Sequence, residues 1–144
     1  MMPGRRALLV EDDADMRALA TCLLRHEGYE VFEAAAGIDL LEWIARTTSD
    51  PWDHFFDVIV SDVNMPDLTA LEVLAALRCR KSRVPVILIT AFADADLRRE
   101  ARALGAYACL EKPLDLDEFH ATLQMLTAGR GIGRDAPDDR TPTS

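Results

Sequence analysis

The sequence predicts an α/β fold, a (βα)5 doubly wound parallel sheet of five strands. The first supporting observation is that short apolar runs alternate with segments in which apolar residues recur at helical spacing. The second is that the central runs are apolar on successive residues, which is typical of strands covered on both faces. The third is the length, because 144 residues make room for one domain. Right-handed crossovers would bury the sheet between two helical layers.

The predicted strands are short apolar runs, and a helical segment follows each of them. The strands cover residues 7–10, 30–34, 55–62, 84–90 and 106–110. Apolar residues at helical spacing in the five segments are Met16, Leu19, Ala20, Leu23 and Leu24, then Leu40, Leu41 and Ile44, then Leu71, Leu74 and Leu77, then Leu97, Ala101 and Leu104, then Phe119, Leu123 and Leu126. Gly28 and Gly105 are expected to end the first and fourth helices, because glycine is preferred just beyond a helix C-terminus.

Glycine and proline separate the end of the chain from the rest. Residues 129–144 contain Ile132 as their only large apolar side chain, and they are predicted to be a disordered tail or linker stub. Residues 1–128 are predicted to form the domain. Arginines and aspartates cancel in the tail, so the net charge of −9 belongs to the domain.

Charge and composition exclude several classes of protein. There are 16 Lys and Arg against 25 Asp and Glu, an acidic balance that argues against binding to nucleic acid or to an anionic membrane. The longest uncharged apolar stretch, residues 84–93, is far shorter than the span of about 18 residues that a membrane helix needs. Cys22, Cys79 and Cys109 include no C-x-x-C pair, which indicates a reducing compartment. We therefore expect a cytoplasmic protein.

Chemically active side chains follow four of the five predicted strands. Glu11 and Asp12 follow the first strand, Asp62 ends the third, Thr90 ends the fourth and Lys112 follows the fifth. The carboxyl ends of parallel strands form the site in such a sheet. Two carboxylates about 4 Å apart repel by roughly 4 kcal/mol at an effective dielectric constant of about 20, and Mg²⁺ is a hard cation that suits these oxygen ligands. Asp62 can then act as a nucleophile in phosphoryl transfer, with Thr90 and Lys112 cradling the phosphoryl oxygens.

Four motifs at these strand ends resemble the response-regulator receiver domain of two-component signalling. They are LLVEDDADMR (8–17), IVSDVNMPD (59–67), VILITA (86–91) and GAYACLEKP (105–113). Each is weak alone, but four in the right order form a specific signal. The resemblance covers residues 5 to about 127, and it implies a flavodoxin-like fold with the five strands in the order 2-1-3-4-5. It also implies a phosphoprotein of the two-component or phosphorelay type.

The resemblance also implies a magnesium site. Asp12 and Asp62 are the expected direct ligands of Mg²⁺, and Glu11 is expected to act through a water molecule. The main-chain carbonyl of Asn64 would be the remaining protein ligand. Asp13 is the looser third acid of the first motif and is expected to cap the first helix with its side chain.

In the same family pattern, Asp62 is the phosphoacceptor, Thr90 is the switch hydroxyl and Lys112 pairs with the phosphoryl group. The Lys112–Pro113 bond is expected to be cis. The donor would be a histidine kinase or a histidine phosphotransfer protein, and the downstream protein partner is unknown. Such a domain catalyses its own phosphorylation and slow autodephosphorylation but turns over no separate substrate, so we do not expect an enzyme. The switched surface would be helix four, strand five and helix five, about residues 91–127.

The chain departs from the family pattern at three places. Cys109 stands where the family has its switch aromatic, and Tyr107 is expected on the same face of the strand by alternation. Thr69 and Ala70 replace the usual acidic-glycine turn, so the loop into the third helix is expected to differ in shape. The segment of residues 46–55 is longer than the connection that the family usually has between helix two and strand three. It is interpreted as a surface insertion with a contact patch at Trp52 and Phe55.

Other function classes stay open at this stage. A phosphatase with an aspartyl nucleophile, of the haloacid dehalogenase type, uses the same groups but needs a second aspartate where this chain has Asn64. A phosphate-independent binding module would act through its surface alone; Cys109 and Ala70 favour it, and the complete set of acids, hydroxyl and lysine argues against it. A flavodoxin-type FMN carrier is excluded by the acidic first loop. Because no output domain follows residue 128, we expect either a stand-alone receiver or a piece of a longer regulator.

Overall fold

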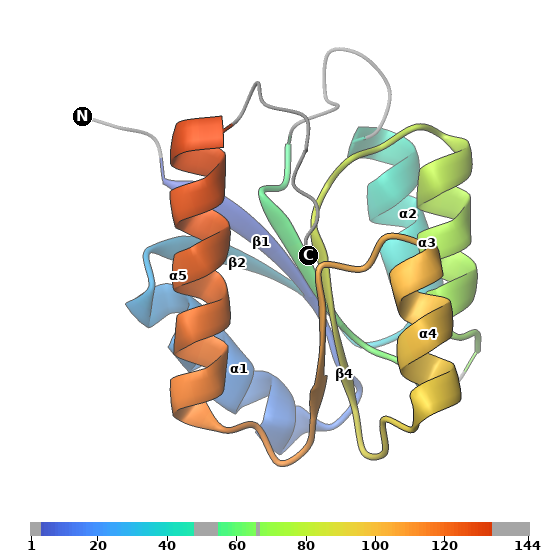
Figure 1. Cartoon of the computed structure of the whole chain (residues 1–144), viewed down its shortest axis with the longest axis horizontal. Helices are drawn as coiled ribbons and strands as arrows, with labels where there is room; N and C mark the ends of the chain where they lie inside the picture. The colour runs from blue at the N-terminus through green and yellow to red at the C-terminus, as the bar shows by residue number, and fades with distance from the viewer. Residues whose placement is uncertain (1–3, 48–54, 66, 134–144) are drawn as a thin grey trace. The chain divides into compact units, whose positions relative to one another are not determined.

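The computed structural model describes residues 4–47, 55–65 and 67–133 (Figure 1). It contains two compact units, Met1–Pro113 and Leu114–Ser144, and each is described by itself. The first unit holds five strands and four helices, and the second holds the last helix. The elements in chain order are β1 (Arg5–Val10), α1 (Ala14–His26), β2 (Tyr29–Ala34), α2 (Gly37–Thr47), β3 (Val58–Asp62), α3 (Ala70–Cys79), β4 (Val86–Thr90), α4 (Ala95–Ala103), β5 (Ala108–Glu111) and α5 (Leu116–Gly133).

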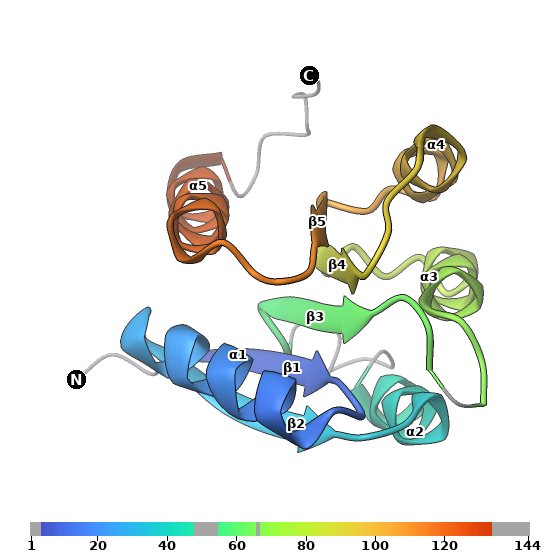
Figure 2. The same ribbon diagram turned by 90° about the horizontal axis from the view of Figure 1, so that it is seen from below.

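The predicted sheet is confirmed: its five strands are parallel and lie in the order β2-β1-β3-β4-β5. Within the first unit, α1 lies on one face of the sheet, and α2, α3 and α4 lie on the other (Figure 2). All residues of β3 and β4 are buried, because both faces of these central strands are covered. Val10 is paired with Ser61, and Asp62 with Ile89, so these three strands end close together at one edge of the sheet.

Three predicted strands begin too early, at residues 55, 84 and 106, because an apolar run can extend beyond the residues that pair. The run at 55–62 includes Phe55 and Phe56, which lie before β3 and pack instead with aromatic side chains of other elements. Phe32, Trp43, Phe55 and Phe56 form this cluster, with ring centroids 4.9–6.2 Å apart. The guanidinium of Arg6 lies 4.6 Å from the centre of the Phe55 ring.

This cluster corrects the interpretation of Phe55 as part of a surface contact patch. Its ring packs against Phe32 and Phe56 and is stacked on Trp43, so it contributes to the packing of α2 and β2 against the chain that enters β3. Edge-to-face aromatic pairs of this kind stabilise a protein by about 1 kcal/mol each beyond the area they bury. The other residue of that interpretation, Trp52, lies outside the described residues.

The helix ends follow the local sequence. Asp13 caps α1, its carboxylate accepting from the backbone N–H groups of Asp15 and Met16, which confirms the expected cap. Gly28 and Gly105 have φ of +97° and +86°, so they end α1 and α4 in the left-handed conformation that glycine adopts without strain.

Helix α3 begins at an unusual turn and ends at a strained one. Thr69 caps it in a reciprocal capping box with Glu72, which replaces the acidic-glycine turn of the family pattern. At its other end, Lys81 has φ of +63°, and its N–H donates to the carbonyl of Arg78. The next residue, Ser82, donates to Leu77, which completes a Schellman motif with lysine where glycine is usual.

In the second unit, α5 extends through residues 129–133, beyond the point where the sequence predicts the start of a tail. Residues 134–144 of that predicted tail lie outside the described residues, so the domain boundary stays a prediction.

The Lys112–Pro113 bond is cis, as expected. None of the helices in the described part of the chain has the length and hydropathy that a membrane crossing requires.

Candidate functional site: a carboxylate pocket with one lysine

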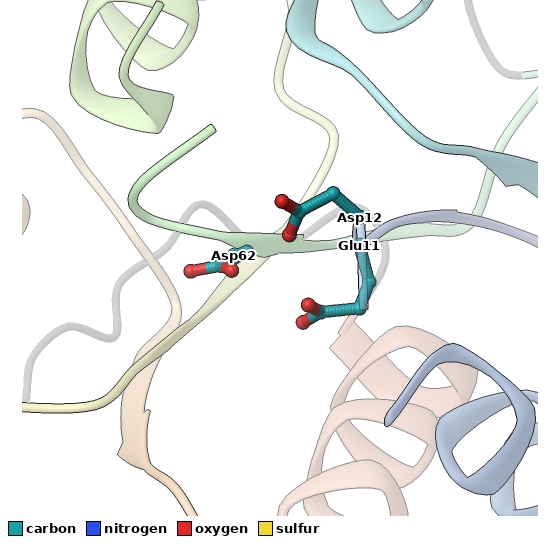
Figure 3. Close-up of side chains that lie close together, drawn as sticks. All are labelled: Glu11, Asp12 and Asp62. Atoms are coloured by element: carbon teal, nitrogen blue, oxygen red, sulfur yellow. The ribbon is translucent and has the colours of Figure 1, made fainter. Parts of the chain in front are cut away.

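Three acidic side chains converge where β1 and β3 end. Glu11 and Asp12 follow β1, Asp62 is the last residue of β3, and Figure 3 shows their carboxylates gathered in one place. One carboxylate oxygen from each lies within 4.8 Å of the other two. Glu11 is 2% exposed and Asp62 is 6% exposed, whereas Asp12 is exposed. The pocket therefore has two buried acids and one acid that faces solvent.

Lys112 enters the same pocket from the segment that follows β5. Its Nζ lies 3.1 Å from Asp62 Oδ2 and 3.2 Å from Glu11 Oε1, so it forms ion pairs with both buried acids. The backbone N–H of Lys112 donates to the carbonyl of Thr90 at 2.8 Å, which fixes this segment against the end of β4. The pocket thus holds one ammonium and three carboxylates, and it retains an excess of negative charge.

The acids are also held by backbone N–H groups from their own loops. Asp13 donates its N–H to Glu11 Oε2, and Asn64 donates its N–H to Asp62 Oδ1, each at 3.1 Å. Arg17 on α1 donates to the main-chain carbonyl of Glu11 at 2.6 Å. The carboxylates are therefore oriented by the chain before any ligand binds.

Burial and like charge act on the protonation of this pocket. Burial is the largest cause that raises the pKa of Glu11, and the Asp62 carboxylate raises it further, against the lowering effects of the Asp13 N–H and Lys112. Burial acts to lower the pKa of Lys112, but its hydrogen bond and attraction to Asp62, followed by those to Glu11, outweigh burial and raise it. The lysine is thus kept charged, while Glu11 binds a proton more readily than usual.

The structure brings together Glu11, Asp12, Asp62 and Lys112 as the sequence predicts. Asn64 is adjacent through its backbone N–H, and its side chain is exposed. Thr90 is 1% exposed at the end of β4, and its hydroxyl both donates to the carbonyl and accepts from the N–H of Phe92, at 3.3 Å each. In this structure the Thr90 hydroxyl is therefore bonded to its own loop.

The expectation that Tyr107 shares a face with Cys109 stays a prediction. Strand β5 begins at Ala108, one residue after Tyr107, and the N–H of Tyr107 donates to the carbonyl of Val86 on β4. Tyr107 is 43% exposed, whereas Cys109 is half-buried and packs against the hydrophobic core. Cys109 therefore occupies the position of the family's switch aromatic with a much smaller side chain.

Two supporting side chains near the site have no signal in the sequence. Glu111, the last residue of β5, accepts the backbone N–H of Ala93 with Oε2 at 2.8 Å. Asp67 accepts the N–H groups of Gly37 and Ile38 at the start of α2, both at 2.9 Å. Both contacts join segments far apart in the chain, so residue spacing carries no information about them.

The residues of the pocket fit a hard divalent cation. They offer carboxylate oxygens from three residues, one of them exposed, together with an unbalanced negative charge. Mg²⁺ is bound in proteins through one or two carboxylates and retains several waters, which the exposed side of Asp12 allows. The acidic pocket can therefore hold a metal ion.

Comparison with known proteins places this pocket in a family. Residues 7–124 match the family model described as the response regulator receiver domain. The chain is 28% identical over 118 residues to sporulation initiation phosphotransferase F of Bacillus subtilis, covering 82% of this chain and 90% of that protein. It is 32% identical over 119 residues to regulatory protein AtoC of Escherichia coli, covering 83% of this chain but only 24% of AtoC.

Solved structures agree with this placement. The signal receiver domain of a putative Luxo repressor protein from Vibrio parahaemolyticus has a TM-score of 0.80 at 25% identity, covering 92% of this chain and 96% of that chain. Chemotaxis protein CheY4 of Vibrio cholerae has a TM-score of 0.73 at 31% identity, covering 86% of this chain and 99% of that chain. Proteins of this family are signalling phosphoacceptors, generally not classed as enzymes, and they interact with histidine kinases or phosphotransfer proteins. The matched residues span most of the chain and all of the acidic pocket, and the chain belongs to the response-regulator receiver domains of two-component signalling.

Proposed function

We propose that this receiver accepts a phosphoryl group on Asp62 from a phosphohistidine donor, in a reaction that depends on Mg²⁺. The observation that carries this proposal is the environment of the Asp62 carboxylate. It is buried at a strand end, with one oxygen held by the N–H of Asn64 and the other by Lys112. A carboxylate oriented in this way beside a cation is suited to nucleophilic attack on phosphorus.

Each residue of the pocket would have its own role in the phosphoryl transfer. Asp12 and Asp62 would hold Mg²⁺ directly, Glu11 through water, and the carbonyl of Asn64 would complete the protein ligands. Bound Mg²⁺ would offset the negative charge of the phosphoryl oxygens as they approach these acids. An oxygen of Asp62 forms the new bond to phosphorus, the bond from phosphorus to the histidine nitrogen breaks, and the imidazole leaves with that electron pair. Lys112 neutralises charge on the transferred oxygens, which is the main requirement of phosphoryl transfer.

The signal would be a shift between two conformations of the chain. The Thr90 hydroxyl, bonded to Phe92 in this structure, would turn toward a phosphoryl oxygen and move the segment that joins β4 to α4. Phosphorylation would therefore change the surface formed by α4 and β5, with α5 included by analogy with the family pattern. Autodephosphorylation would be slow and would return the domain to its resting state.

The donor and the target are proposed by class. The name of sporulation initiation phosphotransferase F describes a transfer protein, and a histidine kinase or histidine phosphotransfer protein is the donor class that we propose here. We propose a protein as the target, with neither nucleic acid nor membrane as a partner, and a location in the cytoplasm. Cys22, Cys79 and Cys109 are all free thiols, which supports a reducing compartment.

The experiment is incubation of the chain with acetyl phosphate and Mg²⁺, followed by intact-mass measurement. We expect the mass of one phosphoryl group to be added to the wild type, and none with EDTA or in Asp62→Ala. Asp13→Asn is the matched control, because asparagine keeps the helix cap and Asp13 lies outside the metal site; it should be phosphorylated like the wild type. An unmodified wild type, or full modification of Asp62→Ala, would refute the proposal. Repeated turnover of p-nitrophenyl phosphate would instead favour a phosphatase.

A further inference from the structure

In the segment between β4 and α4, every residue that follows Ala91 forms a hydrogen bond. Phe92 is bonded through both its N–H and its carbonyl to the Thr90 hydroxyl. The N–H of Ala93 donates to Glu111 Oε2 at 2.8 Å. Asp94 caps α4, its carboxylate accepting from the N–H of Leu97 at 2.8 Å. Of these contacts, the one from Glu111 joins the segment to a different strand.

Glu111 contacts the loop and directly precedes Lys112, a residue of the proposed phosphorylation site. It pairs with Thr90 in the parallel register of β4 and β5, so its side chain reaches the loop without crossing the sheet. The next residue is Lys112, whose ammonium contacts Asp62. A second contact in the same region comes from Arg98 on α4, which donates to the carbonyl of Cys109 at 2.9 Å. Strand β5 therefore holds the start of α4 through one side chain of its own and one carbonyl.

Movement of the Thr90 hydroxyl acts against these hydrogen bonds. While Ala93 is held by Glu111, Phe92 stays between two fixed points and its backbone remains within bonding distance of Thr90. A shift of the hydroxyl toward Asp62 would carry the backbone of Phe92 and Ala93 with it or leave the N–H of Phe92 without its acceptor. Cys109 has a small side chain, so its packing transmits little of this movement to the surface of β5.

We propose that Glu111 is a positioning residue that holds the β4–α4 segment in its resting conformation and thereby sets the equilibrium between the resting and phosphorylated forms. This role rests on the proposed function of Asp62. A contact made in only one of two states biases the equilibrium by its own free energy. Hydrogen bonds to a charged group have a net value of about 1.5 kcal/mol at the weak end of their range, which is about a tenfold change in an equilibrium constant.

The contact itself can be tested without phosphate or metal. Amide hydrogen exchange of Ala93 is measured by NMR in the unphosphorylated protein with EDTA, for wild type, Glu111→Ala and Glu111→Gln. We expect exchange about tenfold faster in Glu111→Ala, and near the wild-type rate in Glu111→Gln, whose amide oxygen can still accept the bond. Equal exchange in wild type and Glu111→Ala would overturn the proposal at its first step.

The coupling is tested by the affinity for beryllofluoride, a phosphoryl mimic, in the presence of Mg²⁺. Glu111→Ala should bind it several-fold more tightly than wild type, because the resting form has lost a contact, and Glu111→Gln should restore the wild-type affinity. Glu100→Ala, which removes an exposed acid on α4, is the control for loss of charge and should bind like wild type.

The outcomes separate this role from the function on which it rests. Faster exchange of Ala93 with unchanged beryllofluoride affinity would overturn the coupling and leave the phosphoacceptor intact. Tighter binding in Glu100→Ala as well would assign the effect to charge and also refute the role of Glu111. If no variant bound beryllofluoride although Ala93 exchange responded as expected, the proposed function would fail, and this role with it.

Discussion

Two regions of the molecule hold charged side chains fully or partly away from solvent, and they satisfy these charges in opposite ways. At the carboxyl end of the strands, Glu11 and Asp62 share one ammonium and repel each other. In the last turn of α3, the half-buried Arg78 donates to the carbonyls of Leu104, Ser82, Val84 and Gly105 at 3.0, 2.8, 3.4 and 2.9 Å. Burial lowers the pKa of Arg78, but a guanidinium stays charged in a protein.

The two regions differ in the groups that balance their charged side chains. The partners of Arg78 are neutral backbone dipoles supplied by the fold, so its environment is the same whatever the solution contains. The carboxylate pocket retains unbalanced negative charge, and only a proton or a cation from solution can complete it. We therefore expect the Arg78 region to contribute a constant stability, and the pocket to make stability depend on Mg²⁺ and pH.

The largest expected effect is at Arg78. Arg78→Met keeps the approximate length of the side chain but removes the donor of all four hydrogen bonds, and we expect a loss of about 3 kcal/mol in the free energy of unfolding. Urea denaturation measures it, with and without Mg²⁺, and the loss should be equal in both conditions. Arg99→Met is the control, because Arg99 is exposed and pairs with Asp96 at the surface; it should change stability by less than about 0.5 kcal/mol. A loss at Arg78 as small as that would remove the contrast between the two regions.

The next effect is stabilisation by Mg²⁺. At about a hundred times its dissociation constant, Mg²⁺ should raise the free energy of unfolding by about 2.7 kcal/mol. Asp12→Asn should lose most of this gain, because it removes one of the three carboxylates of the pocket. Thermal or urea denaturation with and without Mg²⁺ checks both. A full gain in Asp12→Asn would place the metal at another site.

A smaller effect is the pH dependence of the metal-free pocket. Because burial and Asp62 raise the pKa of Glu11 in the folded state, the folded chain binds this proton more tightly than the unfolded chain does. The contribution of Glu11 to stability should therefore fall as pH rises from about its ordinary pKa of 4.5 through its raised value in the folded state. Urea denaturation in EDTA at several pH values should show this decline in wild type and a weaker one in Glu11→Gln. Identical pH profiles would show that Glu11 titrates as it does in the unfolded chain.

The smallest effect tests the strained residue beside Arg78. Lys81 adopts a positive φ that glycine tolerates, so Lys81→Gly should stabilise the chain by about 0.7 kcal/mol. Lys81→Ala keeps the strain and removes the charge, and it should give no such gain. Equal stabilisation by both substitutions would assign the effect to the charge and would show that the conformation of Lys81 carries no cost. Urea denaturation resolves the three proteins.

The pocket was predictable because parallel strands impose it. Apolar runs that alternate with helical segments determine which residues end each strand, and strand ends of a doubly wound sheet meet at one edge. Glu11, Asp12, Asp62 and Lys112 could therefore be assigned to one place from the sequence. The caps at Asp13, Gly28 and Gly105 were equally local, since each depends on a residue type at a helix end.

The remaining features depend on tertiary contacts between residues distant in sequence. Phe55 belongs to an apolar run, but its partners Phe32 and Trp43 decide that it packs in a cluster and not in a strand. No periodic pattern in the sequence indicates the bond of the Thr90 hydroxyl to Phe92 or the contact of Glu111 with Ala93. The same holds for the four carbonyls around Arg78. By itself the sequence determined the alternation of strands and helices, the acidic site and, through its motifs, the family, because these follow from local periodicity and residue type. The tertiary structure decided which polar groups meet, because each such contact depends on the positions of two segments that only folding brings together.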